Sequence, residues 1–108
     1  MNTVVFFCDE AMKINFSKFG DSVFVNFKKC FIKRYGDNRK TLIGTFTGQS
    51  TSIKHILFGT CLVLGESVKN YKILLKYFIK AMKMPYLPPS LIITDSDHLR
   101  KAIDSLSS

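Results

Sequence analysis

Residues 90–103 are the most informative segment of the chain, and they read Ser90-Leu91-Ile92-Ile93-Thr94-Asp95-Ser96-Asp97-His98-Leu99-Arg100-Lys101-Ala102-Ile103. A Pro-Pro pair precedes a short apolar run that ends on Thr94 and Asp95. The pattern predicts a buried strand over residues 91–94, a turn, and a helix that begins near Ser96. A carboxylate at the end of a buried strand is unfavourable unless it is paired or holds a metal. Asp95 is therefore the first candidate for a functional residue.

The composition indicates one basic, well-packed domain. The 108 residues include 46% apolar residues, with 10 Phe and 4 Tyr as bulky core material, and carry a net charge of +8. Such an excess of cations favours acidic partners, with nucleic acid ahead of anionic membrane surfaces. The alternative is that the lysines only keep an apolar domain soluble.

The cysteines and the N-terminus suggest an intracellular protein. Cys8, Cys30 and Cys61 are far apart and form no Cys-x-x-Cys pair or Cys/His cluster, so we expect reduced thiols and no zinc site. The start of the chain lacks the pattern of a secretory signal, and the longest apolar segment, residues 56–65, is too short to span a bilayer. We expect no membrane association, and nuclear localisation if the source is eukaryotic.

The first two thirds of the chain predict a small N-terminal addition followed by a meander. Residues 4–8 form a strand-like run, and a helix then begins at Asp9 and Glu10, turns Ala11, Ile14 and Phe19 inward, and ends at Gly20. Residues 21–27, 41–47 and 54–64 are rich in β-branched, aromatic and apolar residues. Three such strands with short polar connections indicate an antiparallel meander.

The clearest helix begins after Ser67, a good N-cap, and ends near Met84 because three prolines follow. Two faces run along it. The apolar face consists of Val68, Tyr71, Leu75, Phe78 and Met82, and the cationic face of Lys69, Lys72, Lys76, Lys80 and Lys83. A cationic face of this kind is more often simply the hydrated side of an amphipathic helix.

The order strand, strand, strand, helix, strand, helix indicates an α+β fold with a mixed sheet, because a long helix that leads into a buried strand fits a parallel crossover. Three segments also resemble the Mutator-like element (MULE) transposases and the cellular proteins derived from them. They are residues 19–26 (Phe-Gly-Asp followed by a strand), residues 58–82 (a strand, Glu66-Ser67 and a helix), and residues 92–103 (Ile-Ile-Thr-Asp-x-Asp to Ala-Ile). The resemblance implies a ribonuclease H-like sheet. The prediction is a single partial domain over residues 1–108 that is incomplete at its C-terminus.

The resemblance also implies a DNA transposase core with three carboxylates and Mg²⁺ or Mn²⁺, in which two hard cations clamp the scissile phosphate. The first family acid falls on Asn26, which lends only a neutral oxygen. The second falls on Asp95, the surviving acid and the candidate metal ligand. The third, a glutamate, would lie beyond Ser108. We therefore expect no metal to be bound and no catalysis by this chain alone.

Other charged residues have less specific interpretations. Asp95 could instead cap the helix that follows it, Asp97 suits the first turn of that helix, and His55 and His98 have no nucleophile to serve. A basic cluster between the first two meander strands is the candidate DNA-binding surface, and a solvated hairpin is the alternative. The cluster consists of Lys28, Lys29, Lys33, Arg34, Arg39 and Lys40.

Two further classes of function stay open from the sequence. The chain could be a non-catalytic transposase-derived module that binds DNA or protein, or a generic small basic α+β protein. An incomplete domain leaves part of its sheet uncovered, so we expect a possible protein partner on that face.

Overall fold

The structure is a computed structural model that describes residues 3–31 and 40–107. Its elements follow the order β1 (Val4–Phe7), α1 (Glu10–Phe19), β2 (Val23–Phe31), β3 (Lys40–Gly48), β4 (Ile56–Leu64), α2 (Val68–Ala81), β5 (Ile92–Ile93) and α3 (Asp97–Ser107). The fold is a mixed α+β arrangement, as the sequence predicts.

One five-stranded sheet organises the chain, in the order β1-β4-β3-β2-β5. Strands β2, β3 and β4 form the predicted antiparallel meander, and β1 adds to the edge of β4 in antiparallel register. Strand β5 pairs with β2 in parallel, with Val23 opposite Ile92 and Phe24 opposite Ile93. Helix α2 and the loop after it therefore form the predicted crossover between β4 and β5.

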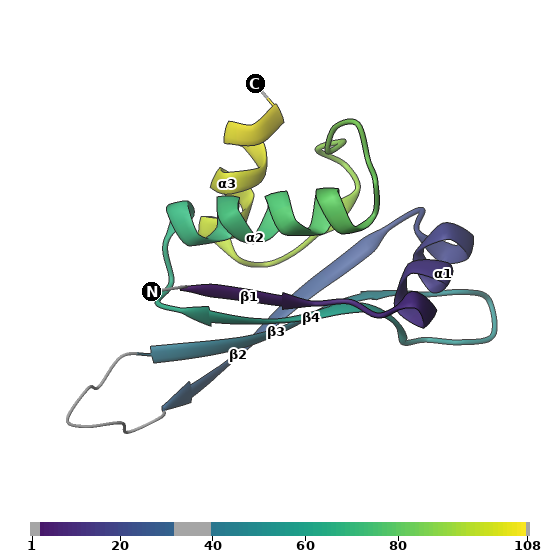
Figure 1. The fold of residues 1–108 in the computed structure, drawn as a ribbon, viewed down its shortest axis with the longest axis horizontal. Helices are drawn as coiled ribbons and strands as arrows, with labels where there is room; N and C mark the ends of the chain where they lie inside the picture. The colour runs from purple at the N-terminus through teal and green to yellow at the C-terminus, as the bar shows by residue number, and fades with distance from the viewer. Residues whose placement is uncertain (1–2, 32–39, 108) are drawn as a thin grey trace.

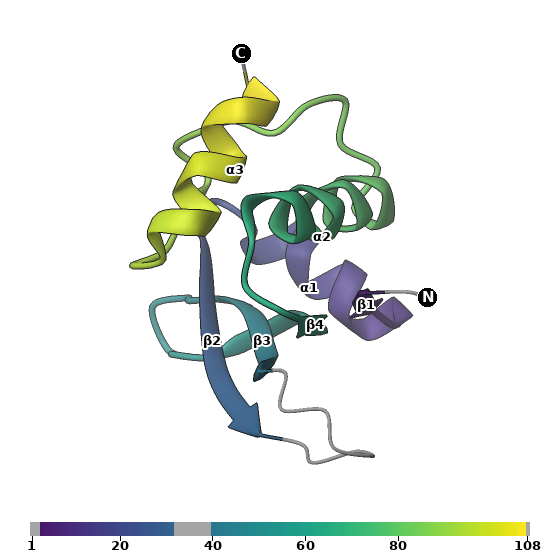
Figure 2. The same cartoon turned by 90° about the vertical axis from the view of Figure 1, so that its left-hand side faces the viewer.

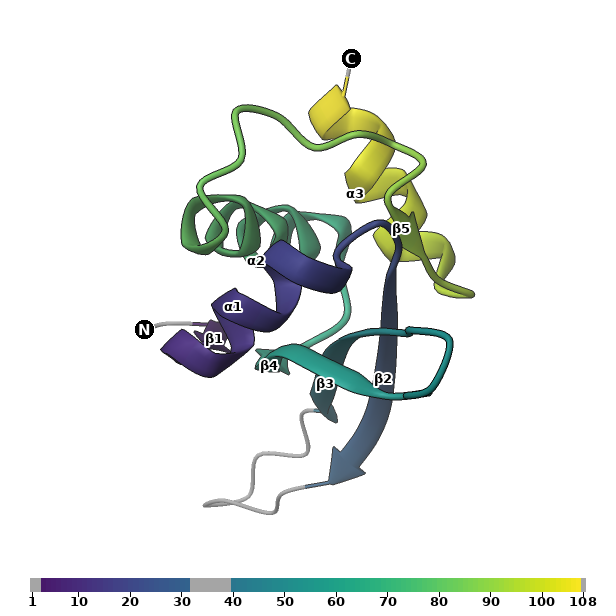
Figure 3. The same cartoon turned by 90° about the vertical axis from the view of Figure 1, so that its right-hand side faces the viewer.

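The three helices lie on one side of the sheet (Figures 1 and 3). Helix α1 packs there through Phe16, whose ring contacts Phe58 of β4 and Phe78 of α2 edge-on. Helix α3 lies beside α2, above β2 (Figure 2). Val25, Leu42, Phe46 and Val63 on this covered face are at most 1% exposed, and so are Leu74 and Leu75 of α2, which pack against them.

The opposite face of the sheet carries no helix in the described part of the chain, and we call it the open face. Val5, Leu62 and Ile43 follow one another across β1, β4 and β3 in the strand register. Val5 is 52% exposed and Ile43 is 44% exposed, although a sheet normally buries its apolar face against another layer. Phe7 and Ile93 extend the same apolar surface.

Two local expectations from the sequence were wrong. Helix α1 buries Met12 and packs Phe16 inward, whereas Ala11 and Ile14 are exposed; the short segment offers two apolar stripes, and contact with β4 selects the other one. Strand β5 is only two residues long and pairs on one side only, so Ile93 is exposed rather than buried.

Candidate functional site

Asp95 lies in the turn between β5 and α3, where it is exposed. The Asp95 carboxylate is therefore hydrated and pays no burial penalty, which was the reason for singling it out from the sequence. Ser96, not Asp95, caps α3: the Ser96 hydroxyl accepts a hydrogen bond from the backbone N–H of Leu99 at 3.2 Å. Within the described residues, no hydrogen bond or ion pair holds the Asp95 carboxylate, so it is available to a ligand.

Asn26 lies in the middle of β2, opposite Thr45 of β3. It follows Phe24 by two residues, just as Asp95 follows Ile93, and Phe24 and Ile93 are the last paired residues of the parallel ladder. The two positions thus come from neighbouring parallel strands at the same level. Their side chains do not share a pocket: the neighbours Val25 and Phe27 point to the covered face, so Asn26 faces the open one.

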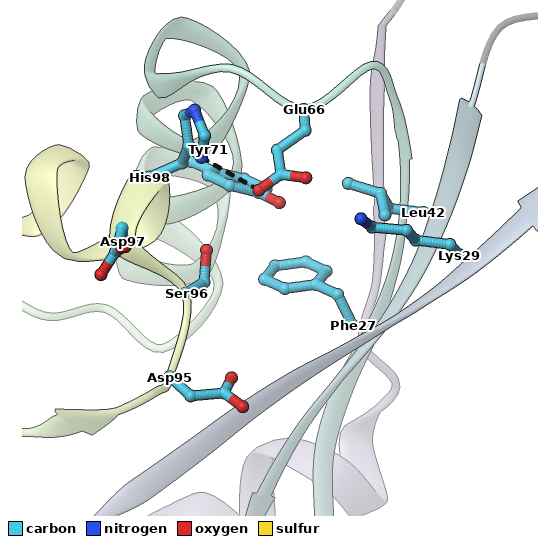
Figure 4. A pocket seen from close by; sticks show the side chains of 9 residues that line it. All are labelled: Phe27, Lys29, Leu42, Glu66, Tyr71, Asp95, Ser96, Asp97 and His98. Atoms are coloured by element: carbon cyan, nitrogen blue, oxygen red, sulfur yellow. Dashed lines mark ion pairs between the residues drawn. The ribbon is translucent and has the colours of Figure 1, made fainter.

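The pocket that contains Asp95 lies on the covered side, between the end of β2 and the start of α3 (Figure 4). It has a volume of about 370 Å³. Its lining combines an aromatic floor with charged groups around the mouth. The residues are Phe27, Lys29, Leu42, Glu66, Tyr71, Asp95, Ser96, Asp97 and His98.

The floor of the pocket is a stacked pair of rings. Phe27 and Tyr71 lie with ring centroids 4.9 Å apart and planes inclined by 25°. Burial, reinforced by the negative charge of Glu66, raises the pKa of Tyr71 from 10.0 to about 12, whereas a hydrogen bond with Ser96 acts in the opposite direction. Tyr71 therefore stays neutral at physiological pH and joins β2, α2 and α3 at one point.

An ion pair closes one side of the pocket. His98 Nδ1 lies 3.0 Å from Glu66 Oε1 (Figure 4). Glu66 precedes the N-cap of α2, whose Ser67 hydroxyl accepts from the backbone N–H of Asn70 at 3.1 Å. The sequence predicted Ser67 as the N-cap, but it gave no partner for His98, because that pairing depends on how α3 packs against α2.

The structure places part of the basic cluster. Lys28 and Lys29 are exposed on β2, with Lys29 at the pocket and Lys28 on the open face. Lys40 is the first residue of β3 and pairs with Phe31. Lys33, Arg34 and Arg39 lie outside the described residues. Asp97 occupies the first turn of α3, as expected.

The residues present do not fit a two-metal centre. Among residues 3–31 and 40–107, no three His, Cys, Asp or Glu side chains gather closely enough to hold an ion. The carboxylates nearest to Asp95 around the pocket are Glu66, which is paired with His98, and Asp97. Hard divalent cations need several oxygen ligands, and the described residues bring no such set together around Asp95.

The comparison with known proteins gives one relative. Over 95 residues, which are 88% of this chain, the sequence is 30% identical to Protein FAR1-RELATED SEQUENCE 9 of Arabidopsis thaliana. The matched part is 16% of that protein, so the chain spans about a sixth of the length of its relative. No family profile and no solved structure matches the chain. In the described residues, no helix has the length and hydrophobicity required to cross a membrane.

Proposed function

We propose that the chain is a transposase-derived domain of the MULE class, with a ribonuclease H-like sheet, related by descent to DNA transposition and unable to cut DNA by itself. Similarity to a FAR1-related protein over most of the chain supports this origin. The strand order β4-β3-β2-β5, with an antiparallel meander and a parallel fourth strand after a helix, supports the fold.

The observation that carries the proposal is the relationship between Asn26 and Asp95. They occupy equivalent levels of two parallel neighbours, but a two-metal phosphoryl-transfer site needs carboxylates that converge on the same pair of cations. An amide supplies no negative charge, so the electrostatic attraction for the first cation is lost. The open-face orientation of Asn26 removes it further from Asp95. The acid that remains cannot hold two cations.

A plasmid-nicking assay tests the loss of activity. Purified chain is incubated with supercoiled plasmid DNA in the presence of Mn²⁺. We expect no nicking above the level of the Asp95→Ala variant. Mn²⁺-dependent nicking that Asp95→Ala abolishes would contradict the proposal.

The alternative proposal within the same origin is a module that binds DNA without cutting it. The charge of +8 supports it, because an excess of cations favours polyanionic partners. Binding through phosphates releases counterions, so the logarithm of the affinity should fall linearly with the logarithm of the salt concentration. Fluorescence anisotropy with a labelled duplex over a salt series measures this dependence. Affinity that is indifferent to salt would rule out this kind of binding.

A protein-binding role is supported by a different observation, the open face. Its row of Val5, Leu62 and Ile43 is apolar and partly exposed, and none of the strands carries an acid, whereas Lys28 borders the row opposite Ile43. We propose an amphipathic helix with acidic flanks as the occupant, because helices cover sheets. The net charge of +8 disfavours a second copy of the same chain.

Calorimetric titration with a designed helical peptide, which has a leucine stripe flanked by glutamates, tests this role. Ile43→Glu should abolish binding, whereas Ile53→Glu, an equally exposed isoleucine in the β3–β4 connection, should leave it intact. Equal binding by a lysine-flanked peptide would contradict the charge argument. Concentration-dependent dimers in sedimentation would identify a second copy as the occupant instead.

A further inference from the structure

Helix α2 carries a row of lysines on its solvent side, which the proposed functions above do not use. Lys69, Lys76 and Lys80 are exposed and Lys72 is half-buried. We call these four residues the lysine ridge. Lys83, just beyond the C-cap of α2, is exposed as well and continues the basic charge.

The spacing gives the ridge a linear shape. Steps of three, four and four residues keep the four side chains within an arc of about 80° around the helix axis, at 3.6 residues per turn. With a rise of 1.5 Å per residue, the ridge extends over about 17 Å. Duplex DNA advances about 3.4 Å per phosphate along one strand, so the ridge is as long as roughly five successive nucleotides.

No negative charge neutralises the ridge from within its own segment. Between Ser67 and Thr94 the chain contains five lysines and no aspartate or glutamate. Lys13 pairs with Glu10 and His98 with Glu66, and neither of these two ion pairs involves a ridge lysine. Neither of these two ion pairs therefore competes with a partner for the ridge lysines.

The opposite side of α2 determines which polyanion fits. This side forms the core between α2 and the sheet. Its residues are at most 1% exposed: Tyr71, Leu74, Leu75 and Phe78. An amphipathic helix binds a membrane by inserting its apolar face, and this face is already occupied. A partner must therefore be recognised by charge and shape alone, as the backbone of a nucleic acid is.

Lys83 adds an independent observation. Its backbone has φ 55°, in the left-handed region where a residue with a Cβ is disfavoured by about 1 kcal/mol. The chain closes a Schellman motif there, with the Met84 N–H donating to the Ile79 carbonyl at 3.0 Å and the Lys83 N–H to the Lys80 carbonyl at 3.2 Å. Glycine would fit this backbone conformation better than lysine does.

We propose that the phosphate backbone of duplex DNA lies along the lysine ridge of α2, with Lys83 as the last contact, rather than on the β2–β3 hairpin. This inference rests on the proposed DNA-binding role and names the surface that carries it. Each contacted phosphate contributes about −0.9 to the slope of log affinity against log salt concentration. A ridge of four to five lysines thus predicts a slope of about −4.

The test is fluorescence anisotropy with a labelled 20-bp duplex over a salt series, using the full chain and two matched double variants. The ridge variant is Lys76→Gln/Lys80→Gln, and the hairpin control is Lys28→Gln/Lys29→Gln. The ridge variant should lose affinity by about tenfold or more and reduce the slope by about 2, whereas the control should stay close to the unmodified chain. Circular dichroism verifies that both variants fold.

Lys83→Gly separates binding from stability. It should raise the midpoint of thermal unfolding, because it relieves the positive φ, and at the same time weaken DNA binding. Binding losses that are equal in the ridge variant and the hairpin control would overturn the ridge assignment and leave the DNA-binding role standing. Failure of the unmodified chain to bind the duplex would overturn both. Stronger binding to phosphatidylserine vesicles than to the duplex, at equal salt, would also overturn the assignment.

Discussion

His98 Nδ1 lies 3.0 Å from Glu66 Oε1, and this ion pair ties the first turn of α3 to the residue that precedes the N-cap of α2. The two residues are far apart in the sequence, yet they close one side of the pocket that contains Asp95. Because α3 follows Asp95 directly, the pair helps to fix where that carboxylate lies.

The ion pair should contribute little to global stability. The side chain of His98 is 50% exposed and that of Glu66 is 31% exposed, and pairs with this degree of solvation contribute less than about 1 kcal/mol. His98→Ala and Glu66→Gln should therefore each lower the free energy of unfolding by less than about 1 kcal/mol. A double-mutant cycle by urea unfolding measures the coupling. A coupling energy several times larger would contradict the solvated character of the pair.

The aromatic cluster between α2 and the covered face of the sheet should contribute strongly to the free energy of unfolding. Phe46 stacks on Phe78 with ring centroids 4.7 Å apart and contacts Phe6 edge-on at 5.5 Å. Phe46→Ala should lower the free energy of unfolding by about 3–5 kcal/mol.

The matched control is Ile43, which lies on the same strand as Phe46 but faces the open side of the sheet. Ile43→Ala should cost less than about 1.5 kcal/mol, because Ile43 is 44% exposed. Urea unfolding of both variants makes the comparison. Equal losses would mean that the open face is covered in solution.

The sequence predicts those parts of the fold that depend on local pattern. Ser67 caps α2 as expected, and the periodicity of Tyr71, Leu75 and Phe78 identifies the buried face. The meander follows from three strand-like segments with polar connections. In each case the residues that decide the structure are close together in the chain.

The features that the sequence did not predict depend on contacts between segments that are distant in the chain. The apolar run before Asp95 predicts a buried strand, but β5 pairs only with β2, so Ile93 and Asp95 are exposed. The pocket joins β2, α2 and α3, and nothing in the local sequence of His98 indicates Glu66 as its partner. The resemblance locates Asn26 and Asp95 on neighbouring strands, but only the strand alternation shows that Asn26 faces the open side.

The half-buried amide of Asn70 should contribute measurably to stability through its hydrogen bonds. Asn70 donates to the carbonyls of Leu64 and Gly65 at 3.2 and 2.8 Å and accepts from the Thr3 hydroxyl at 2.9 Å. It thereby fixes the turn in which Gly65 has φ 97°.

Asn70→Ala should lower the free energy of unfolding by about 2–3 kcal/mol, because it leaves part-buried carbonyls without a donor. Ser67→Ala, which removes only the cap, should cost about 1 kcal/mol. Thermal and urea unfolding of the two variants rank them. The reverse order would show that water replaces the Asn70 donor without loss.

Stability should fall at alkaline pH because burial raises the pKa of Tyr71 from 10.0 to about 12 and that of Cys61 from 9.0 to about 12. Below the unfolded-state values both groups are protonated in both states, and their contribution to stability is fully present. Above those values the unfolded chain releases the protons while the folded chain keeps them, so unfolding becomes more favourable as pH rises towards 12.

Urea unfolding at a series of pH values from 8 to 11 measures this decline. Tyr71→Phe should weaken the part that begins near pH 10, and Cys61→Ala the part that begins near pH 9. A decline that is unchanged in both variants would show that neither group is responsible.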